Sequence, residues 1–573
     1  MTLPWLQHIL LVPILLPLLC GAVLAPLTQG WHRLKFALSY ASVLGLLATA
    51  LVLVAMTDGG YWQDGIGVYL AANWAAPFGI ALVADRLAAM MLLLTALLAM
   101  AALHFAMQRW GRIGVHFHTL FQFLLMGING AFLTHDLFNL FVFFEVMLAA
   151  SYGLVLHGYN STRLRASMQY IAVNLAAALL FLVGTALIYA ATGTLNMADL
   201  AARIPALPAA SAGLVQTGAA ILVLAFLIKS AMWPLGFWLP TTYAAASPPV
   251  AAMLVLMTKV GAYVILRLWL LLFPIGTAGT SSGFGYDALL YGGMATIVFG
   301  AAGMLSSDSA GRMAGYGATV SSGTLLAVIG YGQPSLVVAG LYYLVGSTLA
   351  VAAFLLLIEL IERIRTPRSA MLAVTMEAYA VEDTPDEPKG QGVPAAMAFL
   401  GLSFAACALM IAGLPPLSGF VAKFSLFHAL LNPPVAAGAD AAGVVIPGVG
   451  WVLMALVIAS GLITIISMVR FGVRTFWAAT NATPPKLHRS EVAPIAFLLT
   501  LAVAMTVEAS PIFGYLQRAS AGIHRPADYI GRVLGTPAVP GPAARHAAGA
   551  AGVMGAAGAA AAPGLPASGE AAS

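Results

Sequence analysis

Long apolar stretches alternate with short polar ones along most of the chain. A helix that crosses a bilayer needs about 20 mostly apolar residues, and fourteen stretches approach or exceed that length. They lie at 4–27, 34–56, 83–107, 117–134, 137–157, 166–191, 213–239, 249–273, 286–305, 315–332, 335–361, 394–431, 448–473 and 491–509. The pattern predicts an all-α polytopic membrane protein with about 14 transmembrane helices.

Two longer polar or low-complexity segments interrupt this pattern. The segment 362–393 is charged and separates the eleventh and twelfth apolar stretches, so we expect a soluble loop there. The segment 516–573 ends in a run of Ala, Gly and Pro that has too few large apolar side chains to form a core. We expect this C-terminal tail to be disordered.

The composition supports a membrane protein and excludes several other classes. The chain is 61% hydrophobic and 8% charged, whereas a soluble domain is about a quarter charged. Its two cysteines, in apolar stretches, indicate neither a disulfide framework nor a metal site. The net charge of +5 comes without a basic and aromatic stretch that would indicate nucleic-acid binding. We also see no pattern of catalytic or cofactor-binding residues, so we expect no cofactor and no enzyme activity.

The distribution of Lys and Arg predicts the orientation in the membrane. Most of the 25 basic residues fall in loops after odd-numbered stretches, while Arg86, Arg203 and Arg267 lie in or beside loops on the other side. Basic residues concentrate in cytoplasmic loops. We therefore expect both termini outside the cytoplasm.

Four ionisable residues lie inside the apolar stretches. They are Glu145, Lys229, Lys259 and Lys423. A charge at bilayer depth costs about 2.5–3.5 kcal/mol on insertion scales, so such residues face the protein interior or water and commonly carry function. Structural ion pairs, or lysines that extend to the membrane surface, are the alternative explanation.

Two of these lysines stand beside prolines that interrupt a helix. Lys229 precedes Pro234, and Lys423 follows Pro415. Broken helices at corresponding positions are typical of transporters built from inverted repeats. Stretches 7 and 12 are five helices apart, which predicts two inverted five-helix repeats. The chain is thus expected to divide into helices 1–3 (1–115), the first repeat (116–275), the second repeat with its loop (280–480), helix 14 (481–515) and the tail (516–573).

The acid–base chemistry of these residues suggests a mechanism. Burial disfavours the charged form of lysine, and a nearby carboxylate restores it. If Glu145 approaches Lys229 in one state and withdraws in another, Lys229 binds and releases a proton. The hypothesis is a row of such groups that passes protons along the membrane midplane.

Several motifs resemble one known family. The segments "HDLFNLFVFFEVMLAASYGL", "KSAMWPLGFWLPTTYAAASPPVAAMLVLMTKVGAYVILRL", "GRMAGYGATVSSG", "GLYYLVGSTLAVAAFLLL" and "LPPLSGFVAKFSLF" are similar to the antiporter-like subunits of respiratory complex I and of Mrp-type cation/proton antiporters. The likeness covers about residues 80–480. It is strongest to the D-type subunit of the Mrp (also Mnh or Pha) antiporters, and the loop and long tail favour the potassium-linked branch.

The resemblance implies roles for the buried charged residues. Glu145 and Lys229 match the glutamate and lysine that form a pair, Lys259 the connecting lysine, and Lys423 the terminal lysine. One position departs from the family, which usually reads "YYLVHST" where this chain has "YYLVGST", with Gly346 in place of histidine. A glycine carries no proton, so the path between Lys259 and Lys423 is in doubt.

A few further residues are accessory candidates. Tyr342 and Ser347 offer hydroxyls near Gly346. His135 and Asp136 lie in a loop expected outside the cytoplasm, where they suggest an ion entry; an ordinary helix-capping acid is the alternative for Asp136.

Three functions remain open on the sequence. The first is a proton-translocating subunit of a multisubunit K⁺ or Na⁺/proton antiporter, with a large A-type subunit and several small membrane subunits as partners. The second is a proton-pumping subunit of complex I or of a membrane-bound hydrogenase. The third is a scaffold subunit without transport, which Gly346 favours and the four retained charges oppose.

Overall fold

The computed structural model describes residues 4–158, 160–276, 279–365, 394–433, 446–477 and 486–538, and these are almost entirely helical. The first half contains α1 (Val12–Leu24), α2 (His32–Asp58), α3 (Arg86–Ala106), α4 (Phe117–Leu133), α5 (Leu137–Val155), α6 (Ser161–Thr192), α7 (Met197–Arg203), α8 (Ala209–Lys229), α9 (Trp238–Ala245) and α10 (Pro248–Leu272). The second half contains α11 (Tyr286–Ser306), α12 (Ala310–Tyr331), α13 (Pro334–Glu362), α15 (Ala395–Ala412), α16 (Ser418–Leu431), α17 (Gly448–Gly472), α18 (Arg489–Val507), α19 (Ala509–Ile523) and α20 (Pro526–Gly535).

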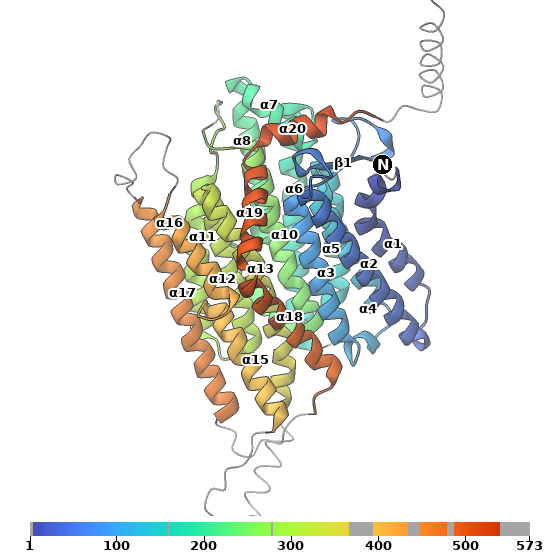
Figure 1. The fold of residues 1–573 in the computed structure, drawn as a ribbon, viewed down its shortest axis with the longest axis vertical. Coiled ribbons are helices and arrows are strands. Elements are labelled where there is room, and N and C mark those ends of the chain that lie inside the picture. Colours follow the sequence, from blue (N-terminus) through green and yellow to red (C-terminus); the bar gives the residue numbers. More distant parts are fainter. Residues whose placement is uncertain are drawn as a thin grey trace, which may run out of the picture.

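The helices form one upright bundle (Figure 1). Among the described residues, twelve helices are long and apolar enough to cross a membrane, and three shorter apolar helices accompany them. Each of the expected apolar ranges overlaps a helix or a pair of helices. The all-helical, multi-pass class is therefore confirmed. The number of fourteen spans and the inverted repeats stay predictions.

Two of the expected spans are broken into two helices. α8 ends at Lys229 and α9 begins at Trp238, with Pro234 between them. α15 ends at Ala412 and α16 begins at Ser418, with Pro415 between them. Proline removes a backbone donor and clashes with the preceding turn, which accounts for the interruption at both places.

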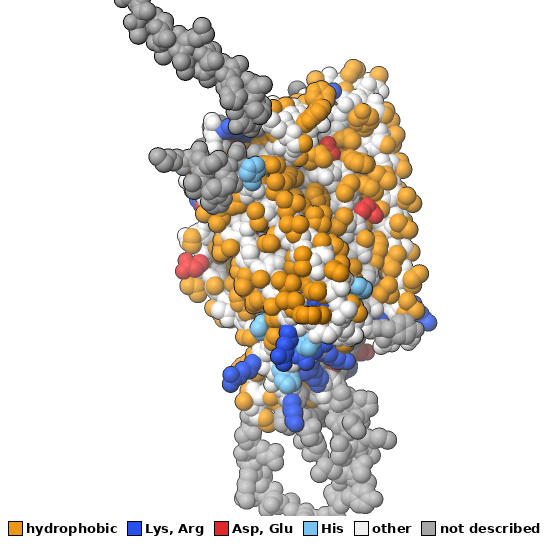
Figure 2. Space-filling model, turned by 90° about the vertical axis from the view of Figure 1, so that its right-hand side faces the viewer, with side chains coloured by type: hydrophobic (Ala, Val, Ile, Leu, Met, Phe, Trp, Pro, Cys, Tyr) orange, Lys and Arg blue, Asp and Glu red, His pale blue; other side chains and the backbone are white. Residues whose placement is uncertain are grey.

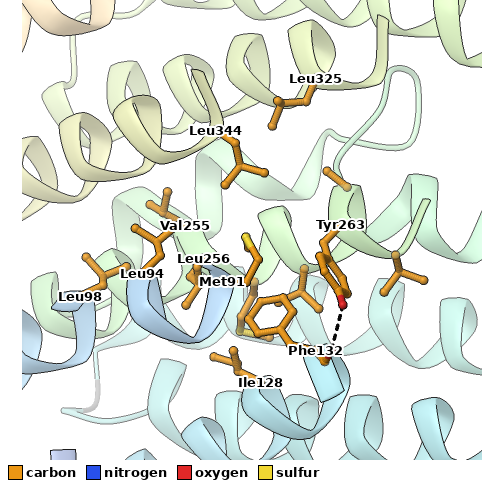
Figure 3. Packing of buried hydrophobic residues seen from close by; sticks show 14 of the residues in the cluster. Met91, Leu94, Leu98, Ile128, Phe132, Val255, Leu256, Tyr263, Leu325 and Leu344 are labelled. Atoms are coloured by element: carbon orange, nitrogen blue, oxygen red, sulfur yellow. Dashed lines mark hydrogen bonds between the residues drawn. The ribbon is translucent and has the colours of Figure 1, made fainter. Parts of the chain in front are cut away.

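α10 is the central helix of the bundle. Every residue from Pro249 to Leu272 is buried. Apolar side chains of α3, α4, α12 and α13 pack around it, and the hydroxyl of Tyr263 donates a hydrogen bond of 2.8 Å to the carbonyl of Phe132 on α4 (Figure 3). Close packing on all sides makes α10 a rigid support for the ionisable residues that it carries.

The chain folds further than expected at its C-terminal end. We expected a disordered tail from residue 516, but α19 continues to Ile523 and α20 follows. α20 lies across the upper end of the bundle beside α7 (Figure 1) and buries Tyr529 and Val533. The expected boundary at 516 is therefore wrong. The low-complexity part after 538 and most of the expected loop, 366–393, lie outside the described residues.

The same end carries a small antiparallel sheet of β1 (Gly67–Leu70) and β2 (Ala81–Ala84), in which Gly67 pairs with Ala84. At the opposite end, Lys and Arg side chains gather below a broad apolar band (Figure 2). Exposed basic residues at this end include Arg33 in the first turn of α2, and Arg109 and Arg112 between α3 and α4. The molecule is thus polarised along its long axis, with one basic end.

Candidate functional site

Lys229 is the last residue of α8 and points into the protein at the first helix break. The residue is only 5% exposed, and its Nζ has no hydrogen-bond partner among the described residues. It lies 4.9 Å from the ring centroid of Phe144 on α5, a cation–π distance. At the break, the indole of Trp238 donates to the carbonyl of Ile228 at 3.2 Å. Lys229 is thus held by an aromatic ring, with no fixed acceptor for its protons.

Glu145 follows Phe144 on α5 and is half-buried. Its Oε1 is buried and lacks a partner in the described part of the chain, where no ion pair joins it to Lys229. The two residues are nevertheless close enough for their charges to interact. The structure therefore brings the expected pair into the same region without direct contact.

A small cavity extends from Lys229 toward α10. Its water-accessible volume is about 10 Å³, and its polar lining comes from Lys229, Tyr170, Asn174, Tyr243 and Thr258. This is room for about one water molecule, which such polar groups can bond. The cavity lies between the broken helix and α10, next to Thr258, the residue before Lys259.

Lys259 begins a short chain of hydrogen bonds between three helices. Its Nζ donates to Ser321 Oγ on α12 at 2.6 Å, and Ser321 Oγ donates to Ser347 Oγ on α13 at 2.8 Å. Lys259 is fully buried. The spacing of these groups permits a proton to pass between α10 and α13.

A second cavity continues from this chain. Its water-accessible volume is about 20 Å³, and it is lined by Ser321, Ser347 and Tyr343 on one side and by Gly419, Ala422 and Thr464 on the other. Ala422 precedes Lys423 on α16. The cavity therefore connects the hydroxyl chain with the neighbourhood of the last lysine.

Lys423 lies at the second helix break. Its Nζ donates to the carbonyl of Ala412, where α15 ends, at 2.7 Å. Gly413 has φ +80°, and a Cβ there would meet Lys423 Cδ at less than the distance of any normal contact. Glycine tolerates this left-handed conformation and leaves the lysine its space. Lys423 thus satisfies a carbonyl that the broken helix leaves free.

Gly346 faces the second break from α13. A Cβ at this position would meet only Ser418 Oγ, at 3.7 Å, and that hydroxyl has no partner among the described residues. The neighbouring Ser347 already belongs to the hydroxyl chain. Gly346, where we expected the proton path to be interrupted, therefore lies next to two hydroxyl groups. One of them, on Ser347, lines the second cavity.

The accessory candidate residues lie in different parts of the protein. Tyr342 donates to the carbonyl of Met505 at 2.8 Å and stacks on Phe513, so its hydroxyl faces α18 and α19 rather than the lysines. Asp136 caps α5, since its Oδ1 accepts from the amide of Asn139. Burial raises the pKa of Asp136. Pro234 and Pro415 lie in the two breaks.

His135 belongs to a buried polar cluster at the end that α20 covers. Arg267 on α10 makes two hydrogen bonds with Asp85, at 2.6 and 2.7 Å. The His135 ring lies 5.4 Å from that of Tyr529 on α20. Burial, together with the charge of Arg267, lowers the pKa of His135 to about 3, so the imidazole is neutral near pH 7.

Sequence reasoning missed Ser321, Asp85 and the role of Arg267. The charge pattern places Arg267 in or beside a loop, whereas it is buried inside α10. The spacing of four between Lys259, Tyr263 and Arg267 was a usable signal, because residues four apart share a helix face. A lone serine such as Ser321 gives no such signal.

The fold and the site together define a class of protein. The chain is a multi-pass helical membrane protein with buried ionisable residues at two broken helices, an arrangement found in ion transporters. Residues 134–446 match the family model described as "NADH:quinone oxidoreductase/Mrp antiporter, TM". The chain belongs to this family, as the motifs indicated.

Curated relatives extend the match over nearly the whole chain. A relative from Rhizobium meliloti (strain 1021), named as the probable D subunit of a K(+)/H(+) antiporter, is 52% identical over 93% of this chain and 98% of its own length. The D subunit of a Na(+)/H(+) antiporter from Alkalihalophilus pseudofirmus is 34% identical over 92% of this chain and 100% of its own length. Among solved structures, a chain of the Mrp complex from Dietzia sp. DQ12-45-1b is 27% identical with a TM-score of 0.75, covering 93% of this chain and 100% of that one.

Proposed function

We propose that this chain is the proton-translocating D-type subunit of a multisubunit monovalent cation/proton antiporter. Its similarity over nearly the full length of relatives named as D subunits of such antiporters supports this function. We favour K⁺ over Na⁺ as the exchanged cation, because the 52% identical relative is named for K⁺ and the 34% identical one for Na⁺.

The observation that carries the proposal is Lys229 at the end of α8. An ammonium group that is buried, without a hydrogen-bond acceptor and near an equally unpaired carboxylate oxygen of Glu145 is expensive to maintain in a membrane. Lys229 differs in this from Lys423, whose Nζ has a fixed acceptor in the carbonyl of Ala412. An unpaired lysine is instead able to change its protonation state as Glu145 approaches or withdraws.

The proton path that we propose joins the four ionisable residues through two cavities. A proton passes from the Glu145–Lys229 pair through the cavity beside Thr258 to Lys259. From Lys259 it passes along Ser321 and Ser347, and through the second cavity to Lys423. Hydroxyl groups and water bridge the position where Gly346 replaces the family histidine.

The setting of the subunit completes the proposal. We place it in a bacterial inner membrane with the basic end of the bundle in the cytoplasm and both termini outside, as the basic loops favour. Residues 116–275 and 280–480 form the two inverted repeats, each with one broken helix. The partners are a large A-type subunit and several small membrane subunits, and no redox cofactor takes part.

Cation-driven proton exchange tests this function. The chain is co-expressed with its genomic neighbours, and proton movement in everted vesicles is followed on addition of K⁺ or Na⁺. We expect exchange with at least one cation, and we expect Lys229→Ala to abolish it in a complex that still assembles. Lys486→Ala, which removes an exposed lysine, is the matched control and should exchange normally.

Two other results of this experiment would each support one of the alternative functions. An assembled complex that shows no cation response would refute the antiporter and favour a redox-driven proton pump, since the family also includes NADH:quinone oxidoreductase subunits. Exchange that survives Lys229→Ala would show that another subunit carries the protons and that this chain is a scaffold.

A further inference from the structure

A large polar cavity opens at the basic end of the bundle. Its water-accessible volume is about 340 Å³, and it lies between the ends of α3, α9 and α13 and the start of α6. Its charged lining comes from Arg109, Arg163, Glu359 and Glu362. We call this cavity the basic-end vestibule. Its size and polar walls are those of a water-filled entrance.

The vestibule and the cavity beside Lys229 share one lining residue. Tyr243 on α9 borders both of them, whereas the other residues of the Lys229 cavity do not line the vestibule. Tyr243 is 2% exposed, and its hydroxyl donates to the carbonyl of Leu254 on α10 at 2.5 Å. The buried side chain of Tyr243 therefore separates the vestibule, which opens to the surface, from the cavity beside Lys229.

The position of Tyr243 in the chain gives this wall a means to move. α9 follows the break after Lys229, and a broken helix lets its second half shift without unwinding the first. The vestibule side of α9 is held by Arg163, whose Nε donates to the carbonyl of Ala245 at 2.8 Å. Tyr243 thus sits on a short helix that is bonded to α6 and α10 and packs against α12.

We propose that Tyr243 is the gate between the basic-end vestibule and Lys229. This inference rests on the proposed function. With the hydroxyl bonded to Leu254, the wall is closed and Lys229 exchanges protons only within the bundle. When α9 moves and the bond breaks, water joins the two cavities and Lys229 exchanges protons with the aqueous phase at the basic end.

Two carboxylates, Glu359 and Glu362, line the vestibule. Glu359 accepts from the indole of Trp110 at 2.7 Å and pairs with Arg363 at 3.1 Å, so it stands fixed in the vestibule wall. Protons reach the gate through the water of the vestibule, past these fixed charges. Tyr243 acts here as a positioning residue, because it controls access and does not itself hold the transported proton.

A leak assay tests the gate without requiring antiport. Everted vesicles that contain the assembled complex receive a pH jump without added K⁺ or Na⁺, and the decay of the pH gradient is recorded. We expect Tyr243→Ala to raise the proton leak about tenfold, because its removal joins the cavities. The matched control is Tyr286→Ala, which removes another buried tyrosine bonded to a carbonyl of α10 but lines neither cavity.

The leak assay has two outcomes that would overturn the gate. One is a Tyr243→Ala complex that holds the gradient as well as the native one. The other is an equal leak with Tyr286→Ala, which would show that any buried cavity loosens the bundle. Because the assay uses no cation, an absence of antiport refutes the proposed function separately from the gate.

Thiol accessibility tests the closed wall in a chain that keeps Tyr243. Cys20 and Cys407 are replaced by alanine, and a charged, membrane-impermeant methanethiosulfonate is added to the everted vesicles. We expect modification of Ala245→Cys, which lines the vestibule, and at least tenfold slower modification of Met257→Cys, which lines the Lys229 cavity. Equal rates, or no reaction at Ala245→Cys, would refute a closed gate beneath an open vestibule.

Discussion

Lys423 on α16 donates a hydrogen bond of 2.7 Å to the carbonyl of Ala412, the residue at which α15 ends. The lysine of one half-helix therefore caps the other half of the same broken span. Lys229 occupies the opposite place, at the end of the first half-helix, and has no such partner in the described chain. The two breaks thus hold their lysines differently, one bonded and one free to respond to Glu145.

This difference predicts separate effects on stability and transport at Lys423. Lys423→Met removes the donor to Ala412 and should lower the free energy of unfolding by about 1–3 kcal/mol, since a buried carbonyl is left unsatisfied. Lys423→Arg keeps a donor and a positive charge but releases no proton. Thermal unfolding in detergent should show a loss mainly for Lys423→Met, while vesicle assays should show lost exchange for both. Full exchange by Lys423→Arg would remove Lys423 from the proton path.

The hydroxyl chain predicts a transport defect when one of its links is removed. Ser321→Ala removes the acceptor of Lys259 and the link to Ser347, and we expect proton exchange to fall about tenfold, a barrier increase of about 1.4 kcal/mol. Ser306→Ala, at the exposed end of α11, is the control because its hydroxyl bonds only the carbonyl of Gly303. Equal exchange rates for the two variants would contradict a path through Ser321.

Gly346 allows the family residue to be restored. A Cβ at this position meets only Ser418 Oγ at 3.7 Å, so the backbone accepts a side chain here without strain. Assembly of the Gly346→His complex is checked before transport is measured. We predict that Gly346→His restores exchange to a Ser347→Ala complex, measured in the same vesicles. Failure of this rescue in an assembled complex would show that the path does not pass between α13 and α16.

His135 predicts how stability depends on pH at the end covered by α20. Its folded pKa of about 3 lies below the unfolded value near 6.5, because burial and Arg267 disfavour the charged ring. The unfolded chain therefore binds an extra proton below pH 6.5, and the folded chain loses stability as the pH falls toward 3. Between pH 6.5 and 5 the loss from this group is about 1–2 kcal/mol.

Thermal unfolding at pH 7 and pH 5 measures this effect. We expect His135→Gln to lose less stability on acidification than the native chain, whereas His32→Gln, at an exposed position, should behave like the native chain. A native-like acid response of His135→Gln would assign the acid sensitivity to other groups.

The sequence predicted the elements that depend on local pattern. Apolar length located the spans, and proline beside a buried lysine located the breaks after Lys229 and before Lys423. What it missed depends on contacts between distant segments. Arg267 looked like a loop charge because Asp85, its partner, lies 182 positions away. α20 was hidden in a tail whose composition is dominated by Ala, Gly and Pro after residue 538, although Tyr529 and Val533 pack against the bundle.

Ser321 and Tyr243 could not be assigned from sequence for a similar reason. Each gains its role from position: Ser321 from standing between Lys259 and Ser347, and Tyr243 from bordering two cavities. Hydroxyl residues are common in membrane helices, so their type alone carries little information.

The central claim is that Lys229 binds and releases the transported proton, and Lys229→Arg tests it most directly. Arginine keeps a positive charge beside Phe144 and Glu145 but is not deprotonated in proteins. The measurement is K⁺- or Na⁺-driven proton exchange in everted vesicles with the assembled complex. We predict that Lys229→Arg abolishes exchange while the complex remains intact. Exchange at the native rate would contradict the claim, because a fixed charge would then be sufficient at this position.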